Sequence, residues 1–299
     1  MAALGEFPYF VGIDAGSSSV KVVALHDAGA GFDVAFRACE AHKGSIAACA
    51  RKLLIAAVSS EELTGGACAG IAATGACAET IREAAPGVRV LEDVPAMTLG
   101  AAVMAPGARS IVQVGAQNAF FVTGVADGRA PQFAMNEGCA AGTGSFFEDQ
   151  MGRLGLSIED YSAIVERAST APRLSGRCAV FAKTDIIHRQ QEGVPIEDIL
   201  LGLCYAMVKS YKATIVRKMP VEAPVLLAGG VVRNAGVVRA VRDVFKLDEG
   251  DLIADTAGVY VQAAGAAAHA AKAVRAGRHD AFVPVDLGNL IAALETGVE

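Results

Sequence analysis

The chain has 299 residues, of which 53% are hydrophobic and 19% are charged, and its formal net charge is −6. This composition indicates a folded protein with room for two medium-sized lobes, and it excludes a largely disordered chain. The negative charge gives no basic surface for nucleic acid. The chain also lacks a run of eighteen uncharged apolar residues, so the sequence does not predict a membrane span. The N-terminus lacks a charged segment with a cleavage site, so we expect a cytoplasmic protein. Seven cysteines, an odd number without close pairing, indicate reduced thiols rather than a disulfide framework.

The first third of the chain predicts a hairpin followed by alternating strands and helices. A buried strand over residues 9–14 leads through a small-residue turn into a second strand over 20–25. This order predicts a mixed sheet flanked by helices. The further elements are strands over 32–38, 69–74 and 88–91, and helices over 42–59, 79–85 and 96–105.

The turn of this hairpin is a candidate phosphate site. Its small residues expose backbone N–H and hydroxyl groups, and Asp14 at the strand end can reach Mg²⁺ through water. Lys21 either adds positive charge there or is a strand residue that faces solvent. Because turns of this type are common in hairpins, the motif alone leaves phosphate binding and an ordinary turn as alternatives. The candidate residues are Gly12, Asp14, Gly16, Ser17, Ser18, Ser19 and Lys21.

The same pattern then repeats. An Ala-Pro-Gly-Ala break at 105–108 predicts a boundary between lobes of residues 1–106 and 107–299. Strands over 110–114 and 120–125 enclose a second turn, and a further strand is predicted over 132–135. Two such halves imply a cleft. The turn residues Gly115 and Gln117 are candidate ligand contacts, although Gln and Asn also simply favour turns.

Two cysteines stand in matching contexts. Cys139 opens a small-residue turn with Gly142 and Gly144 that runs into an amphipathic helix, and Cys178 follows Ser-Gly-Arg and precedes a helix-compatible segment. Consecutive N–H groups and a helix dipole at such places favour a thiolate, so both cysteines are candidate metal-cluster ligands. The alternative is that each is a buried cysteine that packs as a small hydrophobe.

The remaining elements alternate as in the first lobe. After the strand 225–228, Gly229 and Gly230 let the backbone approach a flat ligand, and with Asn234 they are candidate adenosine contacts. We expect His188 at the surface and Cys204 in the core. The tail 281–299 has no catalytic pattern. The other expected elements are a helix over 156–171 capped by Ser157, helices over 181–191, 196–216, 235–245 and 259–276, and a strand over 251–254.

Three of these motifs together resemble the BadF/BadG/BcrA/BcrD ATPase family. They are Gly12-Ile-Asp-Ala-Gly-Ser-Ser-Ser-Val-Lys21, Cys139-Ala-Ala-Gly-Thr-Gly-Ser-Phe-Phe-Glu148 and Ser175-Gly-Arg-Cys178-Ala-Val-Phe-Ala-Lys-Thr-Asp185. The similarity covers nearly the whole chain. It implies an α/β protein of two actin-like lobes, of the acetate and sugar kinase, heat-shock chaperone and actin superfamily, that binds ATP and Mg²⁺ between the lobes. Members include activators of 2-hydroxyacyl-CoA dehydratases and ATP-hydrolysing subunits of benzoyl-CoA reductases.

The resemblance also implies an iron–sulfur cofactor and protein partners. In the iron–sulfur branch of the family, each subunit of a dimer contributes two cysteines to one shared 4Fe-4S cluster, and Cys139 and Cys178 match those ligands. The implied partners are a second identical chain or a paralogue, an acceptor dehydratase or reductase, and an electron donor such as ferredoxin or flavodoxin. The chain would then deliver low-potential electrons to the acceptor.

The second turn departs from the family pattern. Members with ATPase activity usually carry Asp-x-Gly-Gly-Gln-Asp, whereas this chain has Gln113-Val-Gly115-Ala116-Gln117-Asn118. An amide can hydrogen-bond phosphate but cannot act as a base, so we expect ATP binding and slow hydrolysis. The candidate catalytic residues are Asp14, Gln113 and Gln117. The alternatives are a non-hydrolysing paralogous partner subunit, a kinase for a sugar or small metabolite on the same fold, and a structural protein with buried cysteines.

Overall fold

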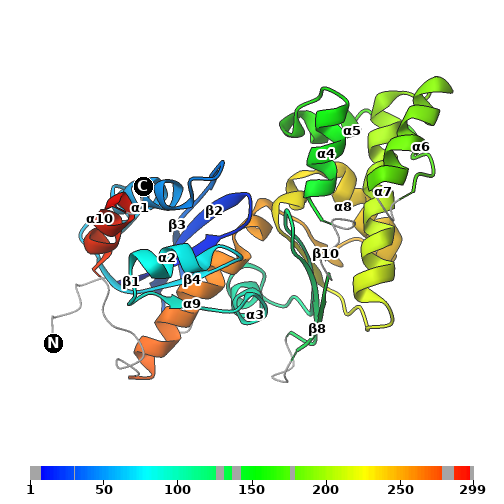
Figure 1. Ribbon diagram of the computed structural model, residues 1–299. Helices are drawn as coiled ribbons and strands as arrows, with labels where there is room; N and C mark the ends of the chain where they lie inside the picture. Colours follow the sequence, from blue (N-terminus) through cyan, green and yellow to red (C-terminus); the bar gives the residue numbers. More distant parts are fainter. Residues whose placement is uncertain are drawn as a thin grey trace. The chain divides into compact units, whose positions relative to one another are not determined.

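In the computed structural model, the described residues form two five-stranded sheets with helices, one sheet in each of two units (Figure 1). Unit 1 comprises Met1–Pro106 and Tyr260–Glu299, and unit 2 comprises Gly107–Val259. The structure describes residues 8–29, 31–125, 131–136, 143–175, 179–277 and 286–296.

The sheet of unit 1 has the strand order β3-β2-β1-β4-β5. Strands β1 (Pro8–Ala15), β2 (Ser19–Asp27) and β3 (Phe32–Ala41) are antiparallel, and β4 (Ala67–Thr74) and β5 (Arg89–Val90) run parallel to β1. The central strand β1 is apolar along most of its length because helices cover both faces of the sheet.

Alternating side chains of β1 divide unit 1 into two hydrophobic clusters. Val11 and Ile13 pack against α1 (Ile46–Val58), α2 (Ala78–Ala84) and α10 (Leu287–Thr296). Phe10 faces the alanine-rich α9 (Val261–Arg275), which lies beside α3 (Asp93–Met104). A short 3-10 helix, Glu61–Leu63, precedes β4.

Residues 260–299 belong to unit 1, and the expected second lobe of residues 107–299 is wrong in this respect. The reason is the close fit of α9 against the rest of unit 1. A Cβ at Gly100 of α3 would lie 1.7 Å from the Val261 carbonyl oxygen, and one at Gly265 of α9 would lie 1.8 Å from that of Ala96. The two helix backbones therefore touch. The C-terminal α10 completes unit 1 by burying Leu287, Leu290 and Leu294 beside α1.

The sheet of unit 2 has the order β10-β9-β6-β7-β8 and repeats the plan of unit 1. Strands β6 (Ser110–Val114), β7 (Ala119–Thr123) and β8 (Gln132–Met135) are antiparallel, and β9 (Val225–Ala228) and β10 (Leu252–Ile253) are parallel to β6. The helices are α4 (Ser145–Arg153), α5 (Tyr161–Val165), α6 (Ala179–Gln191), α7 (Ile196–Tyr211) and α8 (Ala235–Phe245), with 3-10 helices at Ile158–Asp160, Gly230–Arg233 and Thr256–Val259.

The predicted helix over 156–171 is wrong. The chain forms the 3-10 turn Ile158–Asp160 and the short α5, which ends at Val165. The carboxylate of Asp198, on α7, accepts hydrogen bonds from the N–H groups of Ser169 and Thr170 at 2.8 and 3.0 Å. These contacts replace the hydrogen bonds that a longer helix would make. The Ser157 hydroxyl bonds its neighbour Glu159 and caps no backbone N–H.

Helix α7 continues as a π-helical turn, Lys212–Val216. By length and composition, Ile196–Val216 could cross a membrane, but 72% of its apolar window is buried inside the protein. Burial of this kind is typical of a core helix. The hydroxyl of Tyr211 also donates to the carbonyl oxygen of Phe120 on β7, which fixes α7 to the sheet.

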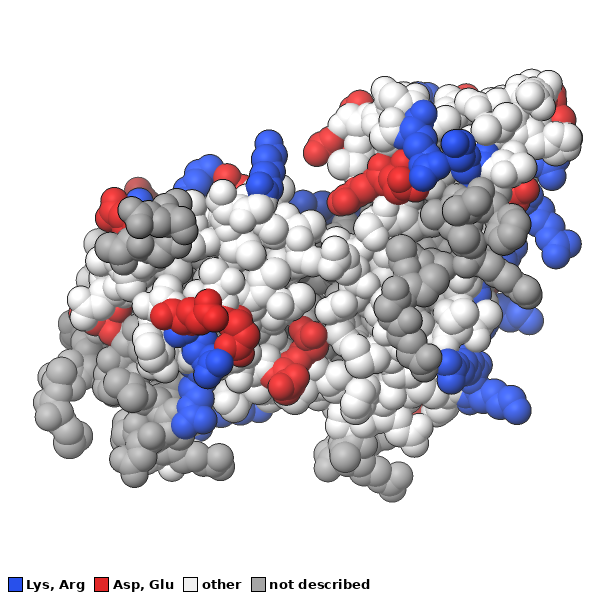
Figure 2. Space-filling view, viewed as in Figure 1, with Lys and Arg blue, Asp and Glu red and all other residues white. Residues whose placement is uncertain are grey.

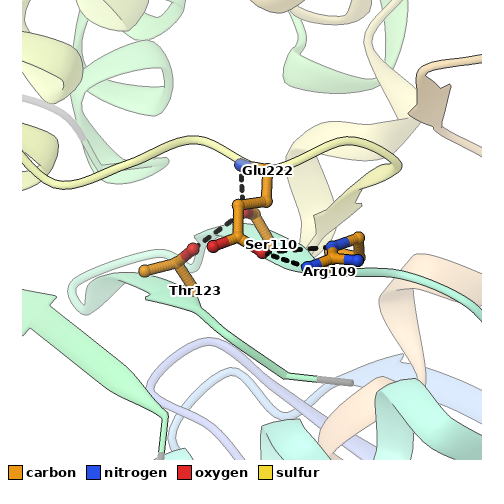
Figure 3. Close-up of polar contacts among 4 residues, drawn as sticks. All are labelled: Arg109, Ser110, Thr123 and Glu222. Atoms are coloured by element: carbon orange, nitrogen blue, oxygen red, sulfur yellow. Dashed lines mark hydrogen bonds and ion pairs between the residues drawn. The ribbon is translucent and has the colours of Figure 1, made fainter. Parts of the chain in front are cut away.

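A polar cluster anchors the start of β6 (Figure 3). The Ser110 hydroxyl donates to Oγ1 of Thr123 at 3.2 Å and accepts from the backbone N–H of Glu222 at 2.8 Å, so this buried group is satisfied. The guanidinium of Arg109 lies 2.8 Å from the Glu222 carboxylate. These contacts hold the end of β6 opposite to the turn that follows it.

Candidate functional site

In unit 1, Asp14 stands one residue before the end of β1 and opposite Lys21 of β2. Nζ of Lys21 lies 3.1 Å from Oδ2 of Asp14, and the two side chains are 13% and 5% exposed. Lys21 therefore does not face solvent, which removes that alternative. A buried carboxylate needs such a partner, because an unpaired charge in the interior is costly.

Thr74 is the partner of Asp14 on the other side, in the parallel strand β4. Its hydroxyl is fully buried and has no hydrogen-bond partner among the described residues. The next residue, Gly75, has a φ of +96°, and a Cβ there would lie 2.4 Å from Oδ1 of Asp14. A buried hydroxyl with unmet hydrogen-bonding capacity beside a carboxylate fits an oxygen-rich ligand or a hydrated cation.

The turn between β1 and β2 is closed by the N–H of Gly16, which donates to the Ser19 carbonyl at 3.1 Å. Residues 16–19 are half-buried. Gly12 has a different part in the fold. A Cβ at Gly12 would lie 1.9 Å from the Ala263 carbonyl oxygen, so this glycine lets β1 pack against α9. Packing alone accounts for it.

In unit 2, Gln113 takes the place in β6 that Asp14 takes in β1, one residue before the strand ends. Gln113 is 4% exposed, and its Oε1 has no hydrogen-bond partner within the described ranges. The turn is closed by the Gly115 N–H, which donates to the Asn118 carbonyl at 2.8 Å. Gln117 is exposed and Asn118 is half-buried. Both units thus carry a buried polar side chain, Asp14 or Gln113, one residue before the end of the first strand of the hairpin.

The two glycines after β9 differ in what surrounds them. Gly229 has a φ of +94°, and a Cβ there would lie 2.1 Å from the Val114 carbonyl oxygen, so the fold itself requires glycine. At Gly230 a Cβ would meet open space. Asn234 caps α8, since its Oδ1 accepts from the N–H groups of Gly236 and Val237 at 2.9 and 3.3 Å. Gly230 is therefore the candidate whose lack of a side chain leaves room for a ligand.

Residues on both sides of the Cys139 motif are hydrogen-bonded to the β6–β7 turn. The N–H groups of Gly144 and Ser145, at the start of α4, donate to the carbonyls of Gly115 and Ala116 at 2.7 and 2.9 Å. Before the motif, the amide of Asn136 donates to the Gln117 carbonyl and accepts from the Ala119 N–H, both at 2.9 Å. Cys139, Gly142 and Cys178 themselves lie outside the described residues.

Asn136 and Ser175 line one cavity of unit 2, with a volume of about 1400 Å³. Each stands three residues before a candidate ligand cysteine. Ser175 is fixed there because its N–H donates to Oδ2 of Asp185 on α6 at 2.6 Å. In the sequence, Cys178 immediately precedes α6. The described residues that precede the two cysteine segments thus line the same cavity.

The described residues hold no cluster of three or more His, Cys, Asp or Glu side chains suited to a metal. Cys204 is fully buried, and burial raises the pKa of its thiol to about 12, as expected for a core residue. His188 is exposed and lies 3.3 Å from Glu192.

Sequence reasoning missed Asp93, which begins α3. Its Oδ1 accepts a hydrogen bond from Nε2 of Gln262 at 2.6 Å. Burial, with a smaller contribution from the charge of Asp14, raises the pKa of Asp93 to about 6. An acidic residue in the first turn of a helix is ordinary, so its position in the sequence carries no signal of a site. Only the fold brings residues 14, 93 and 262 together.

Acidic and basic side chains lie next to one another at several places on the face shown in Figure 2. Among the described residues, Arg82 pairs with Glu79 and Arg153 with Asp149.

The repeated sheet order and the paired hairpins define a two-lobed, actin-like ATPase fold. The (R)-2-hydroxyglutaryl-CoA dehydratase component A of Acidaminococcus fermentans has this fold, with a TM-score of 0.78 at 23% identity over 89% of this chain and 99% of that one. The activator of 2-hydroxyisocaproyl-CoA dehydratase from Clostridium difficile, solved with bound ADPNP, has it with a TM-score of 0.74 at 24% identity over 91% and 97%.

Sequence comparison adds the family. The model of the BadF/BadG/BcrA/BcrD ATPase family matches residues 11–270. An activator of lactoyl-CoA dehydratase from Anaerotignum propionicum is 31% identical over 244 residues, which span 80% of this chain and 90% of that protein. The chain belongs to the BadF/BadG/BcrA/BcrD ATPase family. The predicted family and fold class are confirmed.

Proposed function

We propose that this chain is an ATP-binding iron–sulfur protein that delivers low-potential electrons to a CoA-ester dehydratase or a benzoyl-CoA-type reductase. Family membership and the similarity to an activator of lactoyl-CoA dehydratase support this role. The acceptor enzyme is then the physiological partner, and a ferredoxin or flavodoxin in the cytoplasm is the electron donor.

The observation that carries the proposal is the set of hydrogen bonds from the β6–β7 turn to residues flanking Cys139. Gly144 and Ser145 bond the turn on one side, and Asn136 bonds it on the other. A shift of the turn on nucleotide binding would therefore pull on both ends of the cysteine motif. This linkage supplies a physical route from ATP to a cluster ligand.

Each unit supplies groups suited to the nucleotide. In unit 1, Asp14 and Lys21 would hold hydrated Mg²⁺ and phosphate oxygens, and the Thr74 hydroxyl would gain the hydrogen bond it lacks. In unit 2, the turn at Gly115 and the buried Oε1 of Gln113 stand in the corresponding place, and Gly230 leaves space for the adenosine. Hydrolysis of the bound ATP would supply the free energy that drives the electron transfer.

Cys139 and Cys178 are the residues that would hold the cluster. A 4Fe-4S cluster takes four thiolates, so the two from one chain provide half of the ligands. The donor set fits a cluster shared with a second chain, either identical or paralogous. The cavity lined by both Asn136 and Ser175 supports a joint role for the two cysteine segments.

The test uses anaerobically prepared protein, its iron content and the accessibility of that iron. We expect ADPNP with Mg²⁺ to change the rate at which a chelator removes iron, because the nucleotide acts on the cysteine motif through the turn. Asn136→Ala should bind ADPNP with an affinity near that of the wild type but lose most of this rate change. Gln132→Ala, an exposed change on β8, the strand that directly precedes Asn136, is the matched control. Equal responses in all three proteins, or iron-free wild type, would refute the proposal.

A second candidate is a partner subunit that binds nucleotide but leaves hydrolysis to a paralogue. The amides Gln113 and Asn118, where active relatives carry carboxylates, favour it. Phosphate release by the purified chain separates the two. Turnover without any second protein would exclude the non-hydrolysing role.

A further inference from the structure

Three polar residues of unit 1 come from the carboxyl ends of neighbouring parallel strands. Asp14 lies near the end of β1, and Thr74 ends β4. Asp93 follows β5 closely, and the chain there is fixed because Val90 pairs with Ala73 and the Leu91 N–H donates to the Ala73 carbonyl at 2.8 Å. In α/β sheets, ligands bind at this edge. Asp93 therefore stands at the same edge of the sheet as Asp14 and Thr74.

A hydrogen bond fixes one of the two carboxylate oxygens of Asp93. Oδ1 accepts from the Gln262 amide at 2.6 Å, whereas Oδ2 has no hydrogen-bond partner among the described residues. Gln262 stands in the first turn of α9, and α9 is fixed beside α3 by the Gly100 and Gly265 contacts. The side chain that orients Asp93 is thus itself mounted on a rigid helix pair.

We propose that Asp93 accepts the proton of the water that attacks the γ-phosphate of ATP, and that Gln262 is the positioning residue that orients the Asp93 carboxylate. This inference rests on the proposed ATP-binding function and deepens it. It supplies the base that the amides Gln113 and Asn118 cannot provide.

The step balances as an ordinary hydrolysis. The water oxygen forms a bond to the γ-phosphorus, the bond from that phosphorus to the bridging β–γ oxygen breaks, and ADP leaves with the bonding electron pair. One water proton passes to Oδ2 of Asp93 and then to solvent. No oxidant, reductant or further reactant is required.

Burial and the neighbouring charges of Asp93 set the pH range in which it can act as a base. The ionised form is the base, and the pKa of about 6 places that form in the majority at neutral pH. Burial raises the pKa most, then the charge of Asp14, and more weakly that of Glu92, whereas the Gln262 hydrogen bond lowers it. Lys21 is already paired with Asp14, and α9 contributes only the neutral amide of Gln262 at this point.

The experiment measures ADPNP affinity by calorimetry and phosphate release from MgATP between pH 5 and 8.5. Asp93→Asn should keep its ADPNP affinity within about twofold and lose roughly two to four powers of ten in turnover. Gln262→Leu should move the acid limb of the wild-type pH profile to higher pH, because the bond that favours the ionised carboxylate is gone. A purely structural role would not move this limb.

Glu92→Gln is the matched control, because Glu92 is the exposed neighbour on the same helix start. It should retain turnover at pH 8 and move the acid limb slightly to lower pH, the opposite direction from Gln262→Leu. Wild-type turnover in Asp93→Asn, or an unmoved limb in Gln262→Leu, would overturn the inference and leave ATP binding intact. Wild type that binds ADPNP but releases no phosphate would also overturn it. Wild type that binds no nucleotide would instead refute the proposed function.

Discussion

Nζ of Lys21 lies 3.1 Å from Oδ2 of Asp14, and both side chains are almost buried. Lys21→Met should therefore leave an unpaired carboxylate in the interior and lower the free energy of unfolding by about 3–5 kcal/mol. The double change Asp14→Asn with Lys21→Met should recover most of that loss, because the charge is removed with its partner. Urea unfolding at pH 7 measures both values.

Lys52→Met is the control for loss of a lysine. Lys52 pairs with Glu40 at 2.7 Å, but the two side chains are 67% and 39% exposed. Its removal should lower the unfolding free energy by about 1 kcal/mol or less. If Lys21→Met were no more damaging than this control, the buried pair would have no structural importance.

Much of the fold could be predicted because local patterns and tertiary packing agree. Strands β6, β8 and β9 and helix α8 occur at the expected residues, and α8 begins where Asn234 supplies a side-chain cap. The helix predicted over 156–171 does not form, because Asp198, about thirty residues further along the chain, accepts hydrogen bonds from the backbone N–H groups of Ser169 and Thr170. A single-sequence pattern does not contain that contact.

The site could be predicted only in part, for the same physical reason. Asp14 and Gln113 were found from their own hairpins, since a polar residue in an apolar strand is a local signal. Asp93 and Gln262 are separated by 169 residues and meet only because α9 returns to unit 1. The turn motif predicts Gly12 as a ligand contact, but the backbone of α9 already requires glycine there.

Gly230 and Gly229 give a matched test of the adenosine position. Gly230→Val places a side chain in open space, so it should change the unfolding free energy by less than about 1 kcal/mol and weaken ADP binding by roughly tenfold or more. Gly229→Ala should destabilise the fold by about 2 kcal/mol or more, because a Cβ would lie 2.1 Å from the Val114 carbonyl oxygen. Calorimetry and thermal unfolding report the two effects separately. Unchanged ADP affinity in Gly230→Val would reject this position for the ligand.

Asp93 should also affect the pH dependence of stability. Its pKa is raised from 3.8 to about 6 in the folded protein, so between these pH values the folded state binds more protons than the unfolded state. Its contribution to stability is therefore lost as the pH rises from about 4 to 6. At pH 8 the free energy of unfolding of Asp93→Asn should exceed that of the wild type by about 1 kcal/mol or more. This difference should vanish near pH 4.

The measurement is the difference in unfolding free energy between the two proteins across that range, since other titrating groups cancel in the difference. Glu92→Gln, which changes an exposed acid, should show little dependence of this kind. A difference that is constant with pH would mean that Asp93 titrates normally. Higher stability combined with lost turnover in Asp93→Asn would mark a residue kept for chemistry at the expense of the fold.

The two motif cysteines make a prediction about iron. If each chain supplies two of the four thiolates of a 4Fe-4S cluster, anaerobic protein should contain about two irons per chain, and the iron should elute with a dimer. Cys139→Ala and Cys178→Ala should each abolish the iron while leaving the unfolding transition unchanged. Cys39→Ala, which changes a half-buried thiol on β3 of unit 1, should keep the iron, because that residue lies on a different unit from α4 and α6. Iron and acid-labile sulfide, measured on the same sample as its molecular mass, decide the matter. Full iron in either motif variant would show that the cysteine is not a ligand, and iron confined to a monomer would show that one chain completes the cluster with ligands other than these two thiolates.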